Sequence, residues 1–396
     1  MHLIKLLLIA LLLSLVSGQL VRINITANSA ANITDLLVVI VNIYFMLYTA
    51  LSKRRIILPK FLFPYGAIFF IAAAASTILS LNTYPASDVT LAAFFLVRFI
   101  LYSMLGLVIV NIVQKGEIDK FLNIFIATGF IFTLLGFLQF ILFPDFSTLA
   151  AYGWDPHINR LASTTLDPNY TGGILIILVC ICLSRSLYFP SLKYTLLTLF
   201  FSLAVLLTFS RSTYLAYTVS MLLISMIKSP RIIIFPIALF VASFILVPGA
   251  DTRIIGALTV DETAQSRIES WRNALVIIRD RPAFGVGFNN YRNAQRQYGF
   301  FSDENSDGGH SGAGTDSSLL LILATTGIFG FAIYIAWMLS IFKITVKHLK
   351  DNYLSLALAS LLVALLVHAQ FVNSLLYPQI LMPLVFLISL KYVRDF

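Results

Sequence analysis

Long apolar runs recur along almost the whole chain and are separated by short polar segments. A bilayer core about 30 Å thick needs roughly 20 apolar residues per helix. The pattern predicts about twelve transmembrane helices, near residues 3–18, 35–51, 61–81, 89–114, 121–143, 170–184, 192–209, 212–227, 232–248, 317–342, 353–370 and 376–390. These runs are far longer than the roughly ten-residue strands of an outer-membrane barrel. We therefore predict an all-α fold, a polytopic membrane helix bundle that forms one domain over residues 1–396.

One long hydrophilic segment, residues 249–316, interrupts this pattern. Within it, Ser266 and Glu269 have the spacing of a capping box. Apolar residues then recur on one helical face, namely Ile268, Trp271, Leu275 and Ile278. The segment is predicted to be a large outer-side loop that carries an amphipathic helix. This helix should end at Asp280 or Arg281, before Pro282, and a Gly285-Val286-Gly287 turn should follow.

The composition agrees with a membrane protein and excludes several other classes. Hydrophobic residues make up 59% of the chain and charged residues 11%, whereas a soluble globular domain has about a quarter charged residues. The net charge of +9 is not gathered into basic clusters interleaved with aromatic residues, so nucleic acid is not an expected partner. Cys180 and Cys182 lie in one apolar span without His or carboxylate neighbours. Neither a disulfide nor a zinc site is expected there.

Basic residues predict the orientation of the bundle. Short loops rich in lysine and arginine stay in the cytoplasm, and all eleven lysines fall on one side of the alternating path. We predict a multi-pass protein of the cytoplasmic (inner) membrane with cytoplasmic N- and C-termini and a periplasmic or extracellular 249–316 loop. Ten arginines fall on the outer side: Arg22, Arg160, Arg211, Arg253, Arg267, Arg272, Arg279, Arg281, Arg292 and Arg296. They either pair with nearby acids or bind phosphate, for which a guanidinium is well shaped.

Several polar residues on the outer side have two interpretations each. Asp167 and Asn169 precede the sixth span and either cap a helix or line a site. Asp316, just before the tenth span, suits a general base and suits an N-cap equally. Within the membrane, Arg98 either pairs inside the bundle or reaches a lipid phosphate; no acid is visible in a neighbouring span, which favours the lipid. His368 either lines an acceptor channel or satisfies helix contacts.

Four segments together resemble the superfamily of O-antigen ligases and polysaccharide polymerases. They are Arg160 with Pro168-Asn169, then Ser210-Arg211, then Arg267 through Trp271 with Asp280 and Pro282-Ala283-Phe284-Gly285-Val286-Gly287, and finally Asp316-Ser317-Ser318-Leu319 with Thr326-Gly327-Ile328-Phe329-Gly330. The resemblance implies a membrane glycosyltransferase that joins undecaprenyl-pyrophosphate-linked glycan units on the outer membrane face. It also implies contact with membrane lipid and with a chain-length regulator or other envelope polysaccharide assembly proteins.

The resemblance also implies roles for individual residues. Arg211 and Arg267 correspond to the arginines that hold the pyrophosphate in the ligases, and Arg160 is a third candidate. The ligases carry a histidine where this chain has Asp316, which is more similar to the polymerase branch; His310 is the histidine nearest to that position. Further candidates for the substrate channel are Arg98, Asn169, Trp271, His310 and His368.

The chemistry of transfer from a lipid pyrophosphate agrees with these roles. Guanidinium groups stabilise the charge that develops on the leaving group, and a carboxylate such as Asp316 serves as general base. No cofactor and no metal ion are expected. Together with this chemistry, the resemblance implies a metal-independent polysaccharide polymerase. The alternatives are an O-antigen ligase that transfers glycan to a lipid A core or another acceptor, and, from a different class, a lipid-linked glycan flippase or anion transporter.

Overall fold

The computed structural model describes residues 1–26, 29–246, 262–301 and 314–396. Within these ranges the chain forms fourteen α-helices and one two-stranded antiparallel sheet. The first nine helices are α1 (His2–Leu13), α2 (Ile33–Ser52), α3 (Tyr65–Leu79), α4 (Ala86–Ile112), α5 (Ile118–Leu142), α6 (Pro168–Tyr188), α7 (Leu192–Leu207), α8 (Arg211–Ile227) and α9 (Ile234–Leu246). The others are α11 (Glu262–Asp280), α12 (Tyr291–Gln297), α13 (Ser318–Thr345), α14 (Tyr353–His368) and α15 (Pro378–Asp395).

Each of the twelve predicted spans overlaps one of these helices, which confirms a helical membrane protein. Six stretches of the described chain are long and apolar enough to cross a membrane: α2, α3 with the turn after it, α4, α5 with the turn before it, α6 and α13. Four further apolar helices are shorter, namely those of α1, α7, α9 and α14. That all twelve cross the membrane stays a prediction.

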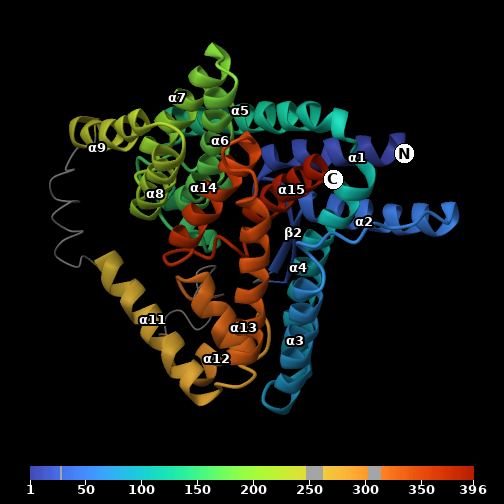
Figure 1. The fold of residues 1–396 in the computed structure, drawn as a ribbon. Helices are drawn as coiled ribbons and strands as arrows, with labels where there is room; N and C mark the ends of the chain where they lie inside the picture. The colour runs from blue at the N-terminus through green and yellow to red at the C-terminus, as the bar shows by residue number, and fades with distance from the viewer. Residues whose placement is uncertain (27–28, 247–261, 302–313) are drawn as a thin grey trace.

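Helix α6 lies at the centre of the bundle and packs against α7, α8 and α14 (Figure 1). Most of its residues are buried, because its sequence is apolar on every side. Two glycines let its neighbours approach closely: a Cβ on Gly172 would lie 2.1 Å from Thr213 Oγ1 of α8, and one on Gly173 would lie 2.6 Å from Ile380 Cδ1 of α15. A second group is formed by α4 against α15 and by α3 against α13.

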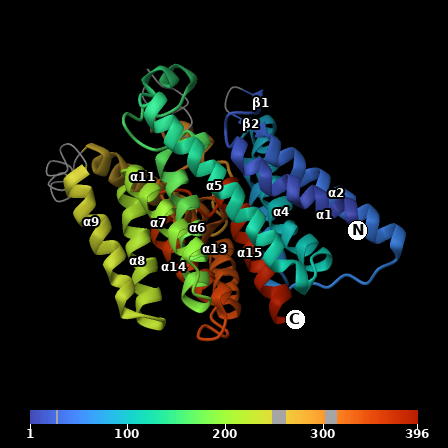
Figure 2. The ribbon, with the colours of Figure 1, turned by 90° about the horizontal axis from the view of Figure 1, so that it is seen from above.

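The loops gather at two opposite ends of the bundle. Seen from above, the hairpin of β1 and β2 and the segment after α5 lie at one end, while the C-terminus lies at the other (Figure 2). Strand β1 (Arg22–Thr26) pairs with β2 (Ser29–Asn32). The all-α fold class is confirmed; this short hairpin is an addition that the sequence analysis did not predict.

Helix α11 is the amphipathic helix expected in the 249–316 segment, of which residues 249–261 and 302–313 lie outside the described ranges. Its end at Asp280 is confirmed. The predicted start at Ser266 is not confirmed, because the helix already includes Glu262 and Ser266 lies in its interior. The prediction of a capping box at Ser266 is therefore wrong. The buried face centres on Ala274 and Ile277, whereas Leu275 is 54% exposed. The apolar stripe is therefore rotated from the one expected, and α11 packs on α13.

The segment that follows α11 docks on a break in α13. Gly327 has a φ of 65° and a ψ of −174°, which interrupts the helix and exposes backbone groups. Residues 282–287 satisfy several of them: Val286 N donates to Ala324 O at 3.0 Å, Gly287 N to Thr325 O at 3.1 Å, and Ile328 N to Pro282 O at 2.8 Å. The expected glycine turn is confirmed by positive φ values at Gly285 and Gly287. This junction fixes the loop relative to the bundle.

Candidate functional site

The start of α8 brings three of the predicted residues together. Arg211 is the first residue of the helix, and Ser210 is its N-cap. The Ser210 hydroxyl donates to Asn169 Oδ1 at 2.7 Å, which ties the start of α8 to the start of α6. Arg160 Nε donates to the carbonyl of Thr208 at 2.9 Å. Arg160, Asn169 and Arg211 therefore converge on one turn, although the first and last are far apart in the sequence.

Asp167 caps helix α6, as one of its two interpretations predicted. One carboxylate oxygen, Oδ1, accepts from the backbone N–H groups of Asn169 at 2.6 Å and Tyr170 at 3.1 Å. Pro168 occupies the first helical position, where its missing N–H costs nothing. Asn169 is not a cap; its side chain instead accepts from Ser210. The second oxygen of Asp167, Oδ2, takes no part in the cap.

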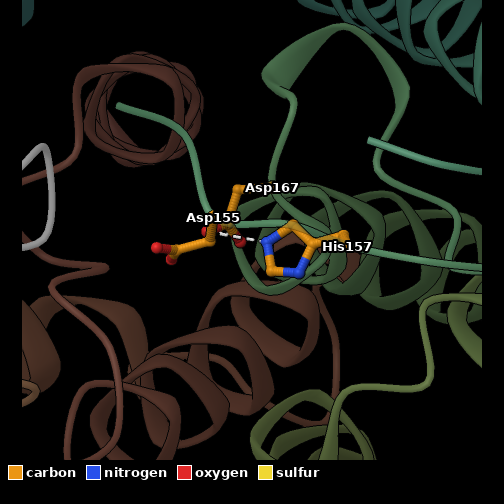
Figure 3. A group of neighbouring side chains, drawn as sticks. All are labelled: Asp155, His157 and Asp167. Atoms are coloured by element: carbon orange, nitrogen blue, oxygen red, sulfur yellow. Dashed lines mark ion pairs between the residues drawn. The ribbon is translucent and has the colours of Figure 1, made fainter. Parts of the chain in front are cut away.

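That second oxygen faces a histidine that the sequence analysis did not include. His157 Nε2 lies 3.9 Å from Asp167 Oδ2, and Asp155 lies beside both, as the close-up shows (Figure 3). One ligating atom from each of Asp155, His157 and Asp167 falls within 4.8 Å of the others. The signal available in the sequence was Asp155 and His157 two residues apart, shortly before the cap of α6.

The loop that carries His157 is held by specific contacts. Phe146 N donates to the carbonyl of His157 at 2.9 Å, and Asn159 N donates to the carbonyl of Pro144 at 2.7 Å. The Arg22 guanidinium lies 4.9 Å from the centre of the Trp154 ring, so the loop is also joined to β1. The position of His157 is consequently set by the fold.

Asp316 does not cap helix α13. The N-cap is Ser317, whose hydroxyl accepts from Leu320 N at 3.3 Å, so the interpretation of Asp316 as an N-cap is wrong. The backbone of Asp316 is fixed to α11 instead: its N–H donates to Ser270 Oγ at 3.1 Å, and its carbonyl accepts from Trp271 Nε1 at 3.4 Å. Trp271 thus contacts the backbone of Asp316, and its ring lies 6.0 Å from that of Phe371.

Electrostatic interactions connect Asp316 with the start of α6. Burial raises the pKa of the Asp316 carboxyl, Arg267 opposes that shift, and Asp155 and Asp167 raise the pKa further. Burial also opposes ionisation of Asp167, but the hydrogen bonds and positive charges from His157, Tyr170 N and Arg160 leave its pKa below the usual range. Asp167 is therefore ionised at neutral pH. Asp316 of the 249–316 segment is therefore close enough to Arg267, Asp155 and Asp167 to interact with their charges.

Arg98 lies outside this site. Its Nε donates to Asp35 Oδ1 at 2.7 Å and its Nη2 to Asp35 Oδ2 at 2.9 Å, so the expectation that it reaches a lipid phosphate for want of an acidic neighbour is wrong. Asp35 caps α2 in a box with Asn32 and also accepts from Tyr102. This ion pair joins α2 to α4.

His368 is fully buried at the end of α14. Its Nδ1 is hydrogen-bonded to Ser374 Oγ, and its Nε2 lies 3.4 Å from Thr213 Oγ1 of α8. These contacts support the interpretation that His368 satisfies helix packing. His310 lies outside the described residues.

A family model described as O-antigen ligase matches residues 196–335. The matched stretch runs from α7 into α13 and contains Arg211, Arg267, Trp271 and Asp316. It confirms the resemblance to the superfamily of O-antigen ligases and polymerases. Arg160, Asn169 and the Asp155–His157–Asp167 cluster precede it. A search of curated proteins found no match.

Proposed function

We propose that this protein is a membrane glycosyltransferase that joins undecaprenyl-pyrophosphate-linked glycan units on the outer face of the cytoplasmic membrane, and that it acts as a polysaccharide polymerase. The family match supports an O-antigen ligase type of enzyme. The observation that carries the proposal is the fixing of the Asp316 backbone to Ser270 and Trp271 of α11, beside the charges of Arg267 and Asp167. The charges of Asp316 and Arg267 thereby interact near the start of α6, which Asn169 ties to the start of α8.

The arginines stabilise the leaving group. When the anomeric C–O bond breaks, the electron pair goes to undecaprenyl pyrophosphate, whose negative charge rises. Arg211 at the start of α8 and Arg267 on α11 bind these oxygens, and Arg160 supports the same turn through Thr208. Preorganised donors of this kind account for a large share of catalysis in many enzymes, about 3–4 kcal/mol for a single donor.

Asp316 serves as the general base. The acceptor hydroxyl oxygen attacks the anomeric carbon, and the hydroxyl proton passes to the Asp316 carboxylate. Burial and the two acidic neighbours raise the pKa of this carboxyl, which makes it a stronger base than an exposed aspartate. General-base catalysis contributes about 10²–10⁴-fold. Because Ser317 is the cap of α13, replacement of Asp316 leaves the helix start intact.

Chain extension by purified protein tests the proposal. The substrate is a lipid-pyrophosphate-linked repeat unit, and the readout is glycan chain length. We expect Arg211→Ala, Arg267→Ala and Asp316→Ala each to lower the extension rate at least a hundredfold. Arg279→Ala, which changes an exposed arginine on the same α11 helix, is the matched control and should retain wild-type activity. Extension that survives all three site substitutions would contradict the mechanism.

A ligase is the second candidate, because the matching family model carries that description. A ligase transfers the glycan to a different acceptor and does not lengthen the donor glycan on its own. The same assay therefore separates the two functions. Product that forms only when a lipid A core or another separate acceptor is added would establish the ligase and reject the polymerase.

A further inference from the structure

We infer that a polar pocket between the end of α3 and the end of α11 binds one sugar of the donor glycan, at a distance from the reacting pyrophosphate. The pocket has a volume of about 350 Å³, which is within the range of small-molecule sites. Its walls come from residues 79–84 and 280–286, and the ends of α3 and α11 lie on the same side of the molecule, close to α12 (Figure 1). The inference rests on the proposed function, whose mechanism does not use this pocket.

The first argument is that hydrogen bonds fix the two walls of the pocket relative to each other. The Ser76 hydroxyl of α3 donates to the carbonyl of Phe284 at 2.5 Å. Asn290 Nδ2 donates to Ser80 Oγ, in the turn after α3, at 2.8 Å. Residues 282–287 are also docked on α13. The pocket is therefore formed before a ligand enters, which reduces the free energy that binding would otherwise spend on ordering the walls.

The second argument is that the side chains of the pocket match the groups of a sugar. A sugar hydroxyl both donates and accepts hydrogen bonds; the Asp280 carboxylate accepts them, the Arg281 guanidinium donates them, and the Asn82 amide does both. All three residues are exposed. Tyr84 and Phe284 also line the pocket, and aromatic rings offer an apolar face to the C–H groups of a sugar ring. One acid beside one base suits a neutral sugar better than a strongly charged one.

Contacts with neighbouring side chains orient two of these polar groups. The Tyr298 hydroxyl donates to Asp280 Oδ2 at 2.8 Å, and the Tyr298 ring stacks on that of Phe300, with 5.5 Å between the ring centres. Burial raises the pKa of the Tyr84 hydroxyl, and the charge of Arg281 opposes that shift, so the guanidinium lies near the Tyr84 ring. The carboxylate and the guanidinium are thus held on opposite elements of one pocket, where both can bind the same sugar.

The third argument concerns the distance from the reacting groups. Arg267 and Asp280 lie on the same helix, α11, and are about 20 Å apart for a helix that rises about 1.5 Å per residue. A donor whose pyrophosphate lies at Arg267 and whose glycan follows α11 would place in the pocket a sugar several units from the reacting bond. Binding so far from that bond adds affinity without changing the chemical step. The pocket would therefore favour a long donor glycan over a single repeat unit.

Binding of lipid-free glycan to the full-length protein in detergent tests the pocket directly. The probes are fragments of several repeat units, released by mild acid from the surface polysaccharide of the source cells, and the readout is saturation-transfer nuclear magnetic resonance. We expect the wild type to saturate these fragments, and Asn82→Ala and Arg281→Ala to do so at least fivefold less. Arg279→Ala, which changes the exposed arginine that precedes the pocket wall on α11, is the matched control and should behave as the wild type does. Absence of saturation by the wild type, or equal saturation by the pocket variants, would overturn the inference.

Chain extension keeps this inference distinct from the proposed function. In Asn82→Ala and Arg281→Ala, the ratio of KM for a donor of several repeat units to KM for a single-repeat donor should rise at least fivefold. Both variants should melt at the wild-type temperature, because both residues are exposed; a raised KM then cannot reflect unfolding. A wild-type KM ratio in both variants would overturn the inference and leave the glycosyltransferase proposal standing. Failure of extension under every condition, together with retained fragment binding, would reject that proposal and leave the pocket as a glycan-binding site.

Discussion

At the scale of single residues, Asp316 is the proposed general base, and its negative charge is unfavourable to the stability of the fold. Burial and the nearby Asp155 and Asp167 raise the pKa of its carboxyl, against the opposing effect of Arg267. An acid whose pKa is higher in the folded state binds its proton more tightly there. Its contribution to the stability of the fold therefore declines as the pH rises above the pKa that the carboxyl has in the unfolded state. At neutral pH the ionised carboxylate therefore destabilises the fold. Functional groups often have such a cost.

The first prediction follows from the raised pKa of Asp316, which makes its ionised carboxylate destabilising at neutral pH. Asp316→Asn should melt at the same temperature as the wild type or higher at pH 7, while its extension rate falls about 10²–10⁴-fold. The wild-type rate should decline as pH falls through the raised pKa of Asp316, and Asp316→Glu should recover part of the activity. The measurements are thermal melting and a pH–rate profile. A drop in melting temperature that matches the loss of activity would point to a structural role for Asp316.

The Arg98–Asp35 pair provides a second prediction. Arg98→Gln or Asp35→Asn alone leaves one charge unpaired between α2 and α4, which costs about 3–5 kcal/mol when the site is fully buried and less here, because the Arg98 side chain is 25% exposed. The double variant should be more stable than the sum of the two effects implies. Melting temperatures of the three variants check this. Arg98→Gln that abolishes extension without lowering the melting temperature would restore the interpretation of Arg98 as a lipid-phosphate ligand.

At the scale of elements, the junction between residues 282–287 and α13 explains two glycine-containing motifs as one structure. A Cβ on Gly327 would lie 2.1 Å from the carbonyl oxygen of Ala283, and one on Gly285 would lie 2.5 Å from that of Ala324. Neither residue can be replaced without moving backbone. The junction lies between α11, which carries Arg267, and α13, which follows Asp316, so it fixes the positions of these two proposed site residues relative to each other.

A third prediction separates strain from close packing at this junction. Gly327 and Gly299 both have positive φ values, 65° and 69°, but nothing lies within 4 Å of a Cβ on Gly299. Gly299→Ala should therefore destabilise the fold only by the free energy of holding an alanine at a positive φ, about 1 kcal/mol. Gly327→Ala should add a clash of about 1–3 kcal/mol and lower chain extension at least tenfold. Equal melting temperatures for the two variants would show that residues 282–287 are not held against α13.

Local patterns predicted elements well and contacts poorly. The helix positions, the cap at Asp167 and the end of α11 depend on a few neighbouring residues, so the sequence alone was sufficient. The Arg98–Asp35 pair was missed because Asp35 sits in the cap of another helix. The role of Ser317 was missed because a one-residue shift decides which side chain meets the first turn. His157 was missed because its partners come together only when the loop after α5 folds back on α6.

At the scale of the whole molecule, the proposed chemistry requires a particular sidedness. Undecaprenyl-linked glycan is used on the outer face, so Arg211, Arg267 and Asp316 must all lie there. In the described structure, the segment after α5 and the β1–β2 hairpin lie at one end of the bundle, opposite the C-terminus (Figure 2). The lysine distribution predicts that the end of the bundle that carries the site faces outward.

The fourth prediction tests this assignment with single cysteines. Cys180 and Cys182 are buried in α6, so a membrane-impermeant maleimide should label the wild type weakly. Arg272→Cys places a thiol on an exposed position of α11, and Lys350→Cys places one in the exposed turn between α13 and α14. Spheroplasts should show labelling of Arg272→Cys at once, and of Lys350→Cys only after the membrane is opened. Labelling of Lys350→Cys in sealed spheroplasts, with Arg272→Cys protected, would invert the topology. The site would then face the cytoplasm, where a lipid-linked donor that has crossed the membrane could not reach it.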